Sequence, residues 1–289
     1  TTDAFNSSTY CWHSWSDNGR NSYTPTQEYV EMFPWSDGTP FDWEKTKSEG
    51  KLDEMFLTGT FKPGEQMLSD IVLTRDPRLY ESGTNSQNET MRYATGYDNM
   101  KYYLGDNDYL RQYTQWVALR LSDIYLTYAE ALLQANNDAR GAIEQVNIVR
   151  SRVGLLGLVE CNPDKNLLTD KDALLEEILR ERACELGMED SRFFDLVRYK
   201  RADRFEKRLH GLLIYRLGED GSRILTAWRD GTGSNSKLGG ALQPVNFEYV
   251  PFELKNPVRH WWTHGFDSKW YLSPFPLAEI NKGYGLVQN

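Results

Sequence analysis

The sequence has few of the residues and motifs that mark the common classes of enzyme and metalloprotein. Its three cysteines, Cys11, Cys161 and Cys184, are far apart and odd in number, so they predict neither a CxxC metal pair nor a disulfide framework. No GxGxxG, GxxxxGK(S/T) or GxSxG motif occurs, which leaves no signal for a dinucleotide, a nucleoside triphosphate or a serine nucleophile. We therefore expect no cofactor.

Long apolar runs and an excess of positive charge are missing as well. No stretch approaches the roughly 18 apolar residues of a membrane span, and residues 1–30 are polar and aromatic, unlike a secretory signal. Lys and Arg number 33 against 42 Asp and Glu, a formal net charge of −9. Because a negative field repels phosphate backbones, we expect no nucleic-acid partner. The chain also begins without Met in loop-like sequence, so we expect an amino-terminal part to be absent from it.

Tryptophan is absent from residues 119–205, and this stretch is the most regular part of the chain. Its apolar residues recur at spacings of three and four, which predicts amphipathic helices. They are Leu121, Ile124, Tyr125, Tyr128, Ala129 and Leu132, then Ala142, Ile143, Val146, Val149 and Val153. Asn136–Asp138 interrupts the pattern and offers an N-cap, and Gly154 is placed to end the second helix.

A second helical pair is expected after the first. Thr169 and Asp172 have the spacing of a capping box, at the start of a helix over about 170–186. Gly187 then separates it from a helix that starts near Glu189. Paired helices of this size resemble tetratricopeptide-type units, which stack because one hairpin cannot bury its apolar face alone.

Aromatic residues and turn signals dominate on both sides of the helical stretch, and all nine tryptophans lie there. A short helix is expected near Thr26–Phe33, and a strand pair at Gly211–Tyr215 and Arg223–Trp228. We predict a mainly α fold of tetratricopeptide-like helical hairpins with an irregular, aromatic-rich loop cap and a few short strands. In this organisation residues 1–118 form the ligand-binding cap, residues 119–205 the scaffold, and residues 206–289 complete the same domain.

Several motifs resemble the C-terminal half of the SusD/RagB family and occur in that family's order. They are a YAEA helix after Arg120, an N-x-x-R-x-R-x-G helix ending at Gly154, and a terminal P-x-P-x-x-E-I-N…Q-N segment. Between the second motif and the terminal segment lies a charged motif made of Glu181, Arg182, Glu185, Leu186, Glu189, Arg192, Asp195, Leu196 and Arg198. Pro25–Glu28 and Arg75–Tyr80 also fit the family's middle region.

The resemblance implies a nutrient-binding protein that does not cleave its ligand. Members of the family are surface lipoproteins of the outer membrane in Bacteroidota-type bacteria, and they cap a SusC-like TonB-dependent transporter. The expected partners are an oligosaccharide or polysaccharide, that transporter, and the missing N-terminal half of the same protein. The lipid anchor is expected on an N-terminal cysteine absent from this chain, because Cys11 has no apolar leader.

The alternating charges of the family motif favour ion pairing over catalysis. A glycosidase needs two carboxylates roughly 5–10 Å apart across a sugar, whereas carboxylates bracketed by arginine have lowered pKa values and make poor general acids. Guanidinium–carboxylate pairs between neighbouring helices explain the alternation. We expect structural ion pairs at Glu181, Arg182, Glu185, Arg192 and Asp195, and a salt-bridged turn at Arg75, Asp76 and Arg78. No catalytic residue is expected.

The aromatic clusters are the candidate ligand site. A sugar offers apolar C–H faces and polar edges, so its site needs flat rings beside polar side chains, as in the segments Cys11–Tyr23 and Phe33–Trp43. The residues expected to bind a glycan are Trp12, Trp15, Asn18, Arg20, Trp35, Asp37 and Trp43. The alternative is that these rings only pin long loops in small satellite cores.

Other patterns predict no metal site. His260 and His264 are four residues apart, but they lack the glutamate of an HExxH motif and lie between Pro257 and Gly265. Two further functions remain as alternatives. A glycoside hydrolase would need distant carboxylates to converge, and a tetratricopeptide-type scaffold that binds proteins would usually need more than two hairpins.

Overall fold

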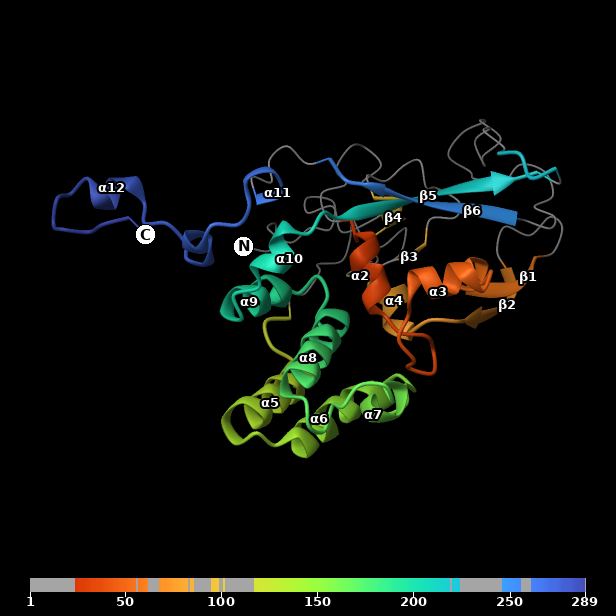
Figure 1. Ribbon diagram of the computed structural model, residues 1–289, viewed down its shortest axis with the longest axis horizontal. Helices are drawn as coiled ribbons and strands as arrows, with labels where there is room; N and C mark the ends of the chain where they lie inside the picture. The colour runs from red at the N-terminus through yellow and green to blue at the C-terminus, as the bar shows by residue number, and fades with distance from the viewer. Residues whose placement is uncertain are drawn as a thin grey trace, which may run out of the picture.

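The structure is a computed structural model that describes residues 24–55, 57–61, 68–82, 84–85, 95–98, 101, 117–218, 220–223, 246–255 and 261–288. In these residues helices predominate, and strands occur as three separate two-stranded sheets. Figure 1 shows the long helices together in one lobe and the strands in another. The predicted fold class, mainly α with helical hairpins and a few short strands, is therefore confirmed. None of the described helices is long and apolar enough to cross a bilayer.

The first hairpin consists of α5 (Leu121–Asn136) and α6 (Ala139–Arg152). Asn137 closes α5 in the left-handed conformation, and the Asp138 side chain accepts a hydrogen bond of 2.9 Å from the Gly141 amide at the start of α6. Gly154 follows α6 with φ +82°, a conformation that favours glycine. The predicted boundaries of this hairpin are confirmed.

The second helical pair, α8 (Lys171–Glu185) and α9 (Ser191–Arg198), follows the short α7 (Leu158–Cys161). The expected capping box is wrong by one position, because Asp170 and not Thr169 caps α8. The Asp170 carboxylate accepts from the amides of Asp172 and Ala173. A carboxylate is also the better cap because it opposes the positive end of the helix dipole.

The apolar core of the helical lobe lies between α5, α6 and α8. Its fully buried members are Leu126, Ala129 and Leu133 of α5, Ala142, Val146 and Val149 of α6, and Leu174 and Ile178 of α8. The expected stripe on α5 was partly wrong, because Leu121, Ile124 and Tyr128 are at least half exposed. Helix α5 thus has two apolar faces, of which the structure covers one.

The second lobe begins with α2 (Gln27–Met32), capped by Thr26, and α3 (Trp43–Ser48), capped by Asp42. The 3-10 helix η3 (Leu52–Glu54), the strand pair β1 (Leu57–Phe61) and β2 (Leu68–Leu73), and α4 (Pro77–Ser82) follow. Two short strands, β3 (Thr84–Asn85) and β4 (Tyr97–Asp98), form another sheet. A second core cluster unites this lobe with α8 through Val30, Phe33, Leu79 and Cys184.

The longest sheet pairs β5 (His210–Leu217) with β6 (Asn246–Glu253) in antiparallel register. The strand expected near Arg223 is therefore not the main partner of β5; Arg223 forms an isolated bridge with Leu217, and residues 224–228 lie outside the described part of the chain. Helix α10 (Ala202–Glu206) precedes β5, and α11 (Trp261–His264), η4 (Ser268–Tyr271) and α12 (Leu277–Ile280) follow β6. Figure 1 shows the segment with η4 and α12 reaching away from the two lobes as an arm.

Candidate functional site

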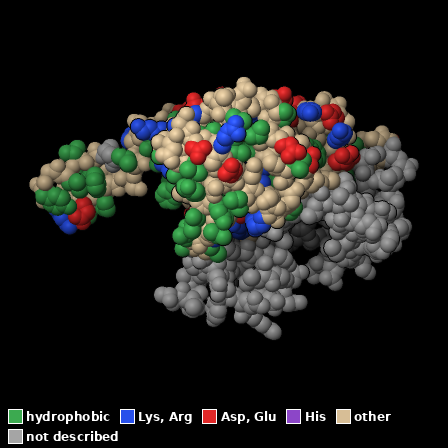
Figure 2. All heavy atoms as spheres, turned by 90° about the horizontal axis from the view of Figure 1, so that it is seen from below, with side chains coloured by type: hydrophobic (Ala, Val, Ile, Leu, Met, Phe, Trp, Pro, Cys, Tyr) green, Lys and Arg blue, Asp and Glu red, His purple; other side chains and the backbone are tan. Residues whose placement is uncertain are grey.

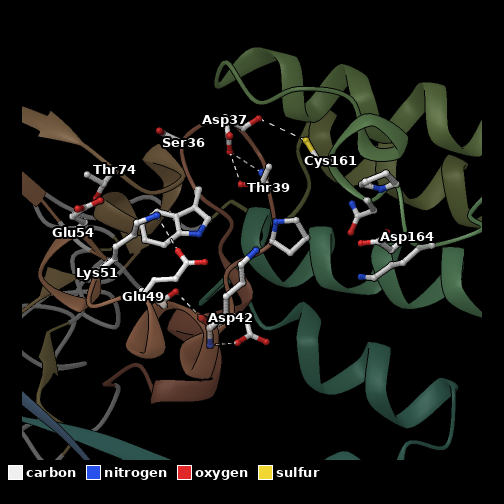
Figure 3. Close-up of a pocket in the computed structure, with 17 residues that line it drawn as sticks. Ser36, Asp37, Thr39, Asp42, Glu49, Lys51, Glu54, Thr74, Cys161 and Asp164 are labelled. Carbon is white, nitrogen blue, oxygen red and sulfur yellow. Dashed lines mark hydrogen bonds and ion pairs between the residues drawn. The ribbon is translucent and has the colours of Figure 1, made fainter.

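A cavity of about 770 Å³ lies where the two lobes meet. Three stretches and Thr74 line it. The stretches are the Trp35–Asp42 loop between α2 and α3, residues 45–54 of α3 and η3, and residues 161–165 at and after the end of α7. Figure 3 shows Asp37 and Thr39 on the loop between Lys51 on one side and Asp164 and Cys161 on the other. The cavity therefore combines residues that are more than 100 positions apart in the sequence.

The loop on the cavity wall has a defined backbone conformation. Trp35 pairs with Arg75 as an isolated antiparallel bridge, and the Ser36 amide donates to the carbonyl of Thr74 at 2.9 Å. The Asp37 carboxylate accepts from both the amide and the hydroxyl of Thr39, each at 2.8 Å. These bonds close a tight turn and orient Asp37 and Thr39 at the cavity.

Arg150 of helix α6 binds the backbone of the cavity loop. The Arg150 guanidinium donates to the carbonyls of Gly38 at 3.1 Å and Leu156 at 2.9 Å. Gly38 has φ +98°, and a Cβ there would lie 2.6 Å from Nη2 of Arg150 and 2.9 Å from Sγ of Cys161. The position therefore requires glycine for both its conformation and the close approach of these side chains.

Of the aromatic residues expected to bind a glycan, Trp35 is on the cavity. Its ring is partly exposed, lies 5.5 Å from that of Phe41, and has the Arg75 guanidinium 5.5 Å from its centroid. Asp37 also lines the cavity. Trp35 and Trp43 both pack against the second core cluster, and of the two only Trp35 is on the cavity wall. The structure thus places Trp35 and Asp37 on the cavity and Trp43 away from it. Trp12, Trp15, Asn18 and Arg20 lie outside the described residues.

Asn162 is a polar residue of the cavity wall that sequence reasoning missed. Its amide nitrogen donates to the carbonyl of Leu158 at 2.8 Å, and the side chain is almost fully buried. Among the described residues its Oδ1 is one of the few buried side-chain acceptors without a hydrogen-bond partner. This oxygen has almost no accessible surface, so Asn162 shapes the wall and does not offer its Oδ1 to a ligand. The turn-like Asn162-Pro163-Asp164 sequence was the only local signal for this part of the wall.

The charge of the cavity wall is negative overall. Five carboxylates and three ammonium groups line it, so 3 − 5 gives a formal charge of −2; they are Asp37, Asp42, Glu49, Glu54 and Asp164, and Lys45, Lys51 and Lys165. Lys51 pairs with Glu49 at 2.9 Å, and this hydrogen bond lowers the pKa of Glu49. Lys165 pairs with Glu177 outside the cavity wall. The wall therefore offers many acceptors and few unpaired cations.

A buried ion-pair network joins α4 and the residue before it to α6 and α8. Arg78 contacts Asp76 at 2.6 Å, Glu181 at 2.6 Å and Glu185 at 3.0 Å, while Arg150 contacts Glu181 at 3.0 Å. Burial raises the pKa of Glu181, but Arg78 and Arg150 outweigh burial and hold this pKa below its usual range. In the same way Arg120 and Arg78 overcome burial and lower the pKa of Glu185 to about 2. These carboxylates stay ionised and join α8 to α4 and α6.

The rest of the charged motif connects α8 with α9 and α5. Arg182 contacts Asp195 at 2.9 Å and Asp123 at 3.1 Å, and burial raises the pKa of Asp195. Arg192 differs from the expectation, because its guanidinium donates to the carbonyl of Leu179 at 3.1 Å and no carboxylate in the described chain lies within ion-pair distance. Asp195 and Arg192 still attract each other electrostatically, although they form no direct ion pair.

Arg75 is fully buried, and its guanidinium binds backbone carbonyls. Its guanidinium donates to four backbone carbonyls, those of Val30, Phe33, Pro34 and Met55, at 2.6–3.3 Å. It also lies 3.8 Å from the centroid of the Phe41 ring. Arg75 therefore fastens the end of α2 and the start of the cavity loop to the region around η3.

Of the two histidines spaced four residues apart, the structure describes one. His264 ends α11, and His260 lies outside the described residues. In the part of the chain that the structure describes, no group of three or more His, Cys, Asp or Glu side chains could hold a metal ion.

Comparison with known proteins identifies the family of this chain. The sequence model of the SusD family matches residues 1–289. The chain belongs to the SusD family. A SusD-like protein of Bacteroides ovatus is 41% identical over 86 residues, 29% of this chain and 13% of that protein. A SusD-like protein of Formosa agariphila is 35% identical over 141 residues, 47% of this chain and 26% of that protein.

Two solved structures share the SusD fold seen here. A SusD-like protein of Bacteroides fragilis superposes with a TM-score of 0.58 at 24% identity, covering 92% of this chain and 46% of the other. A SusD-like carbohydrate binding protein of the same species has a TM-score of 0.51 at 21% identity, covering 89% of this chain and 47% of the other. This SusD-family chain thus spans about half the length of the solved relatives, and its matches cover a smaller share of the curated ones.

Proposed function

We propose that this SusD-family chain binds a glycan in the cavity between its two lobes and does not cleave it. The observation that carries the proposal is the combination on one wall of the partly exposed Trp35 ring and the Asp37 carboxylate. A flat ring can lie against the apolar face of a sugar, and the carboxylate can accept hydrogen bonds from its hydroxyls. One structural relative is described as a carbohydrate binding protein, which supports the same ligand class.

The cavity favours uncharged or amino-substituted glycans over polyanionic ones. Its formal charge of −2 repels sulfate and carboxylate groups, and two of its three lysines are already paired with Glu49 and Glu177. The protein as a whole has a net charge of −9, which adds to this discrimination at low ionic strength.

The wider role is capture of oligosaccharides at the cell surface for a SusC-like TonB-dependent transporter. Family membership supports this role, and with it a lipid-anchored position on the outer membrane. In this proposal residues 1–118 provide the ligand-binding cap, residues 119–205 the scaffold and residues 206–289 the completion of one domain. This chain covers 46% and 47% of the two solved relatives, which supports a further partner, the N-terminal half of the same protein.

The test is a calorimetric titration with neutral, amino-substituted and anionic soluble polysaccharides, with product analysis in parallel. Trp35→Ala is expected to weaken binding about 30-fold, the effect of removing an aromatic anchor worth about 2 kcal/mol. Trp270→Ala, on the arm, is the matched control and should leave the affinity unchanged. Asp164→Asn probes the same wall without removing a ring. Binding unaffected by Trp35→Ala, or released sugar products, would contradict the proposal.

A further inference from the structure

Lys165 lies on the cavity wall, yet its ammonium group is bound by a carboxylate outside that wall. Its Nζ contacts Oε1 of Glu177 on α8 at 2.5 Å, and the Glu177 side chain is only 6% exposed. The Lys165 amide donates to the carbonyl of Asn162 at 3.1 Å, and the Leu167 amide donates to the carbonyl of Lys165 at 2.8 Å. Leu167 is buried in the helical core, so the turn that carries Lys165 is anchored to that core.

The two oxygens of Glu177 accept hydrogen bonds from different cations. Oε1 accepts from Lys165, whereas Oε2 accepts from Nε and Nη2 of Arg180 at 2.9 and 2.5 Å. Arg180 also donates through Nη1 to the carbonyl of Met32 at 2.9 Å. Burial raises the pKa of Glu177, but Arg180 and Lys165 outweigh burial and hold this pKa below its usual range. The carboxylate therefore stays ionised at neutral and mildly acidic pH and keeps the ammonium of Lys165 on α8.

Asp164, the neighbour of Lys165 in the sequence, presents an exposed carboxylate on the same stretch of the wall. Figure 3 shows Asp164 across the cavity from Lys51 and Glu54. Opposite charges on adjacent residues would partly cancel each other if the lysine side chain were free to move. Because Glu177 holds Lys165, the α7 side of the cavity presents a carboxylate whose neighbouring ammonium is engaged elsewhere.

The charge that a ligand meets in the cavity is set by nearby side chains. Figure 2 shows acidic and basic side chains interspersed over the face of the body seen there, without a broad field of one sign. At physiological ionic strength, interactions between exposed charges are largely screened beyond about 8 Å. Moving one ammonium group onto or off the wall therefore changes the field at the ligand more than distant charges do.

We propose that Glu177 sets the charge preference of the cavity by withholding Lys165 from it, so that the α7 side selects sugars with a primary amine over sugars with a carboxylate or sulfate. Glu177 is a positioning residue, because it acts through Lys165 and does not touch the ligand. The ammonium of an amino sugar takes the place beside Asp164 that Lys165 would otherwise occupy. This preference deepens the proposed glycan binding and rests on it.

The test measures the affinities of three soluble oligosaccharides of equal length at mildly acidic pH and low salt. They are a glucosamine oligomer, whose amines are charged under these conditions, its N-acetylated form, and an oligogalacturonate. In Glu177→Gln the single amide oxygen stays with Arg180, which offers it two donors, and Lys165 loses its acceptor.

The size of the expected change follows from the distance between charges. One unit charge placed roughly 6 Å from a ligand charge, at an effective dielectric constant of about 40, changes the affinity about tenfold. We expect Glu177→Gln to bind oligogalacturonate about tenfold more tightly and the glucosamine oligomer about tenfold more weakly than wild type. Its affinity for the N-acetylated oligomer should stay within about twofold of the wild-type value, because this ligand carries no charge.

Glu176→Gln is the matched control, because Glu176 is the adjacent residue of α8 and pairs with Arg201 and Arg204, away from the cavity wall. It should change each affinity by less than about twofold. Adding Lys165→Met to Glu177→Gln should abolish the gain for oligogalacturonate, because that gain depends on the freed ammonium. A fold that is only destabilised would weaken all three ligands alike and would not respond to the second substitution.

Lys165→Met alone leaves Glu177 paired with Arg180, so it creates no unpaired buried charge. Its affinity for the N-acetylated oligomer should stay within about twofold of wild type, because the ammonium binds Glu177 and not the sugar. A loss of about tenfold in this variant, or equal ratios of the three affinities in wild type and Glu177→Gln, would overturn the charge preference and leave the glycan site in place. If none of the three oligosaccharides binds, the glycan site itself fails, and the charge preference fails with it.

Discussion

Arg150 connects the buried ion-pair network to the cavity loop, and replacing it by lysine separates its two tasks. Lysine keeps a positive charge beside Glu181, which also retains its 2.6 Å contact with Arg78. The hydrogen bonds to the carbonyls of Gly38 and Leu156 are lost, because an ammonium group cannot reproduce the planar fork of a guanidinium.

The expected cost follows from those two acceptors. A buried carbonyl left without its donor costs about 1–3 kcal/mol, so Arg150→Lys should destabilise the fold by about 3 kcal/mol. For a chain of this size that lowers Tm by about 6–12 °C. Release of the Gly38 carbonyl also frees the loop that carries Trp35 and Asp37, so glycan affinity should fall several-fold.

The assay is thermal unfolding together with glycan titration, and Arg152→Lys is the control. Arg152 lies one half-turn further along α6, is more than half exposed and pairs with Glu185 at 2.8 Å. Only the Arg152 side of this pair is exposed, and Arg152→Lys keeps a positive charge near the buried Glu185, which also keeps Arg78 and Arg120. The expected loss is therefore below about 1 kcal/mol. Equal effects of the two substitutions would refute the assignment of the loop to Arg150. So would a large loss of stability without any change in affinity.

Three further predictions concern stability and reactivity. The pKa values of Glu181 and Glu185 are lower in the folded state than in the unfolded state. These carboxylates therefore stabilise the fold above about pH 5, and their contribution is lost as the pH falls toward about 2. A urea unfolding midpoint that stays constant over this pH range would refute the prediction. Gly38→Ala should lower the free energy of unfolding by about 1–3 kcal/mol, and Gly50→Ala by clearly less, because the space around Gly50 is open. Equal denaturant midpoints for the two variants would contradict the close approach at Gly38. Burial raises the pKa of Cys184 to about 12, so its thiol should react with a disulfide reagent only on unfolding, and rapid reaction of the native protein would disprove this.

The helical hairpins could be predicted because their signals are local. Asp138 at the start of α6 and Gly154 after it act within a few residues, and the core face of α6 follows directly from the spacing of its apolar residues. The face of α5 could not be predicted from spacing, because apolar residues occupy two sides of that helix. The strand that pairs with β5 could not be predicted either, because strand pairing depends on contacts between residues far apart in the chain.

The candidate site was likewise predictable only where its signals are local. Trp35 and Asp37 were identifiable because a ring beside a polar turn is a local pattern, and both line the cavity. Asn162 was not, because it reaches the same wall from a segment more than 120 residues away. The residue types of the charged motif predicted ion pairing. The sequence did not predict that Arg78 pairs with Glu181 or that Arg192 donates a hydrogen bond to a backbone carbonyl.

The sequence by itself thus determined the family, the helical hairpins and the kinds of side chain available for ligand binding. Those features arise from periodicity, capping and motif order along the chain. Only the tertiary structure decided which faces are covered, which carboxylate each arginine meets, and where the cavity lies. The reason is physical: burial, ion pairing and a cavity wall depend on distances between segments, and packing of the two lobes sets those distances.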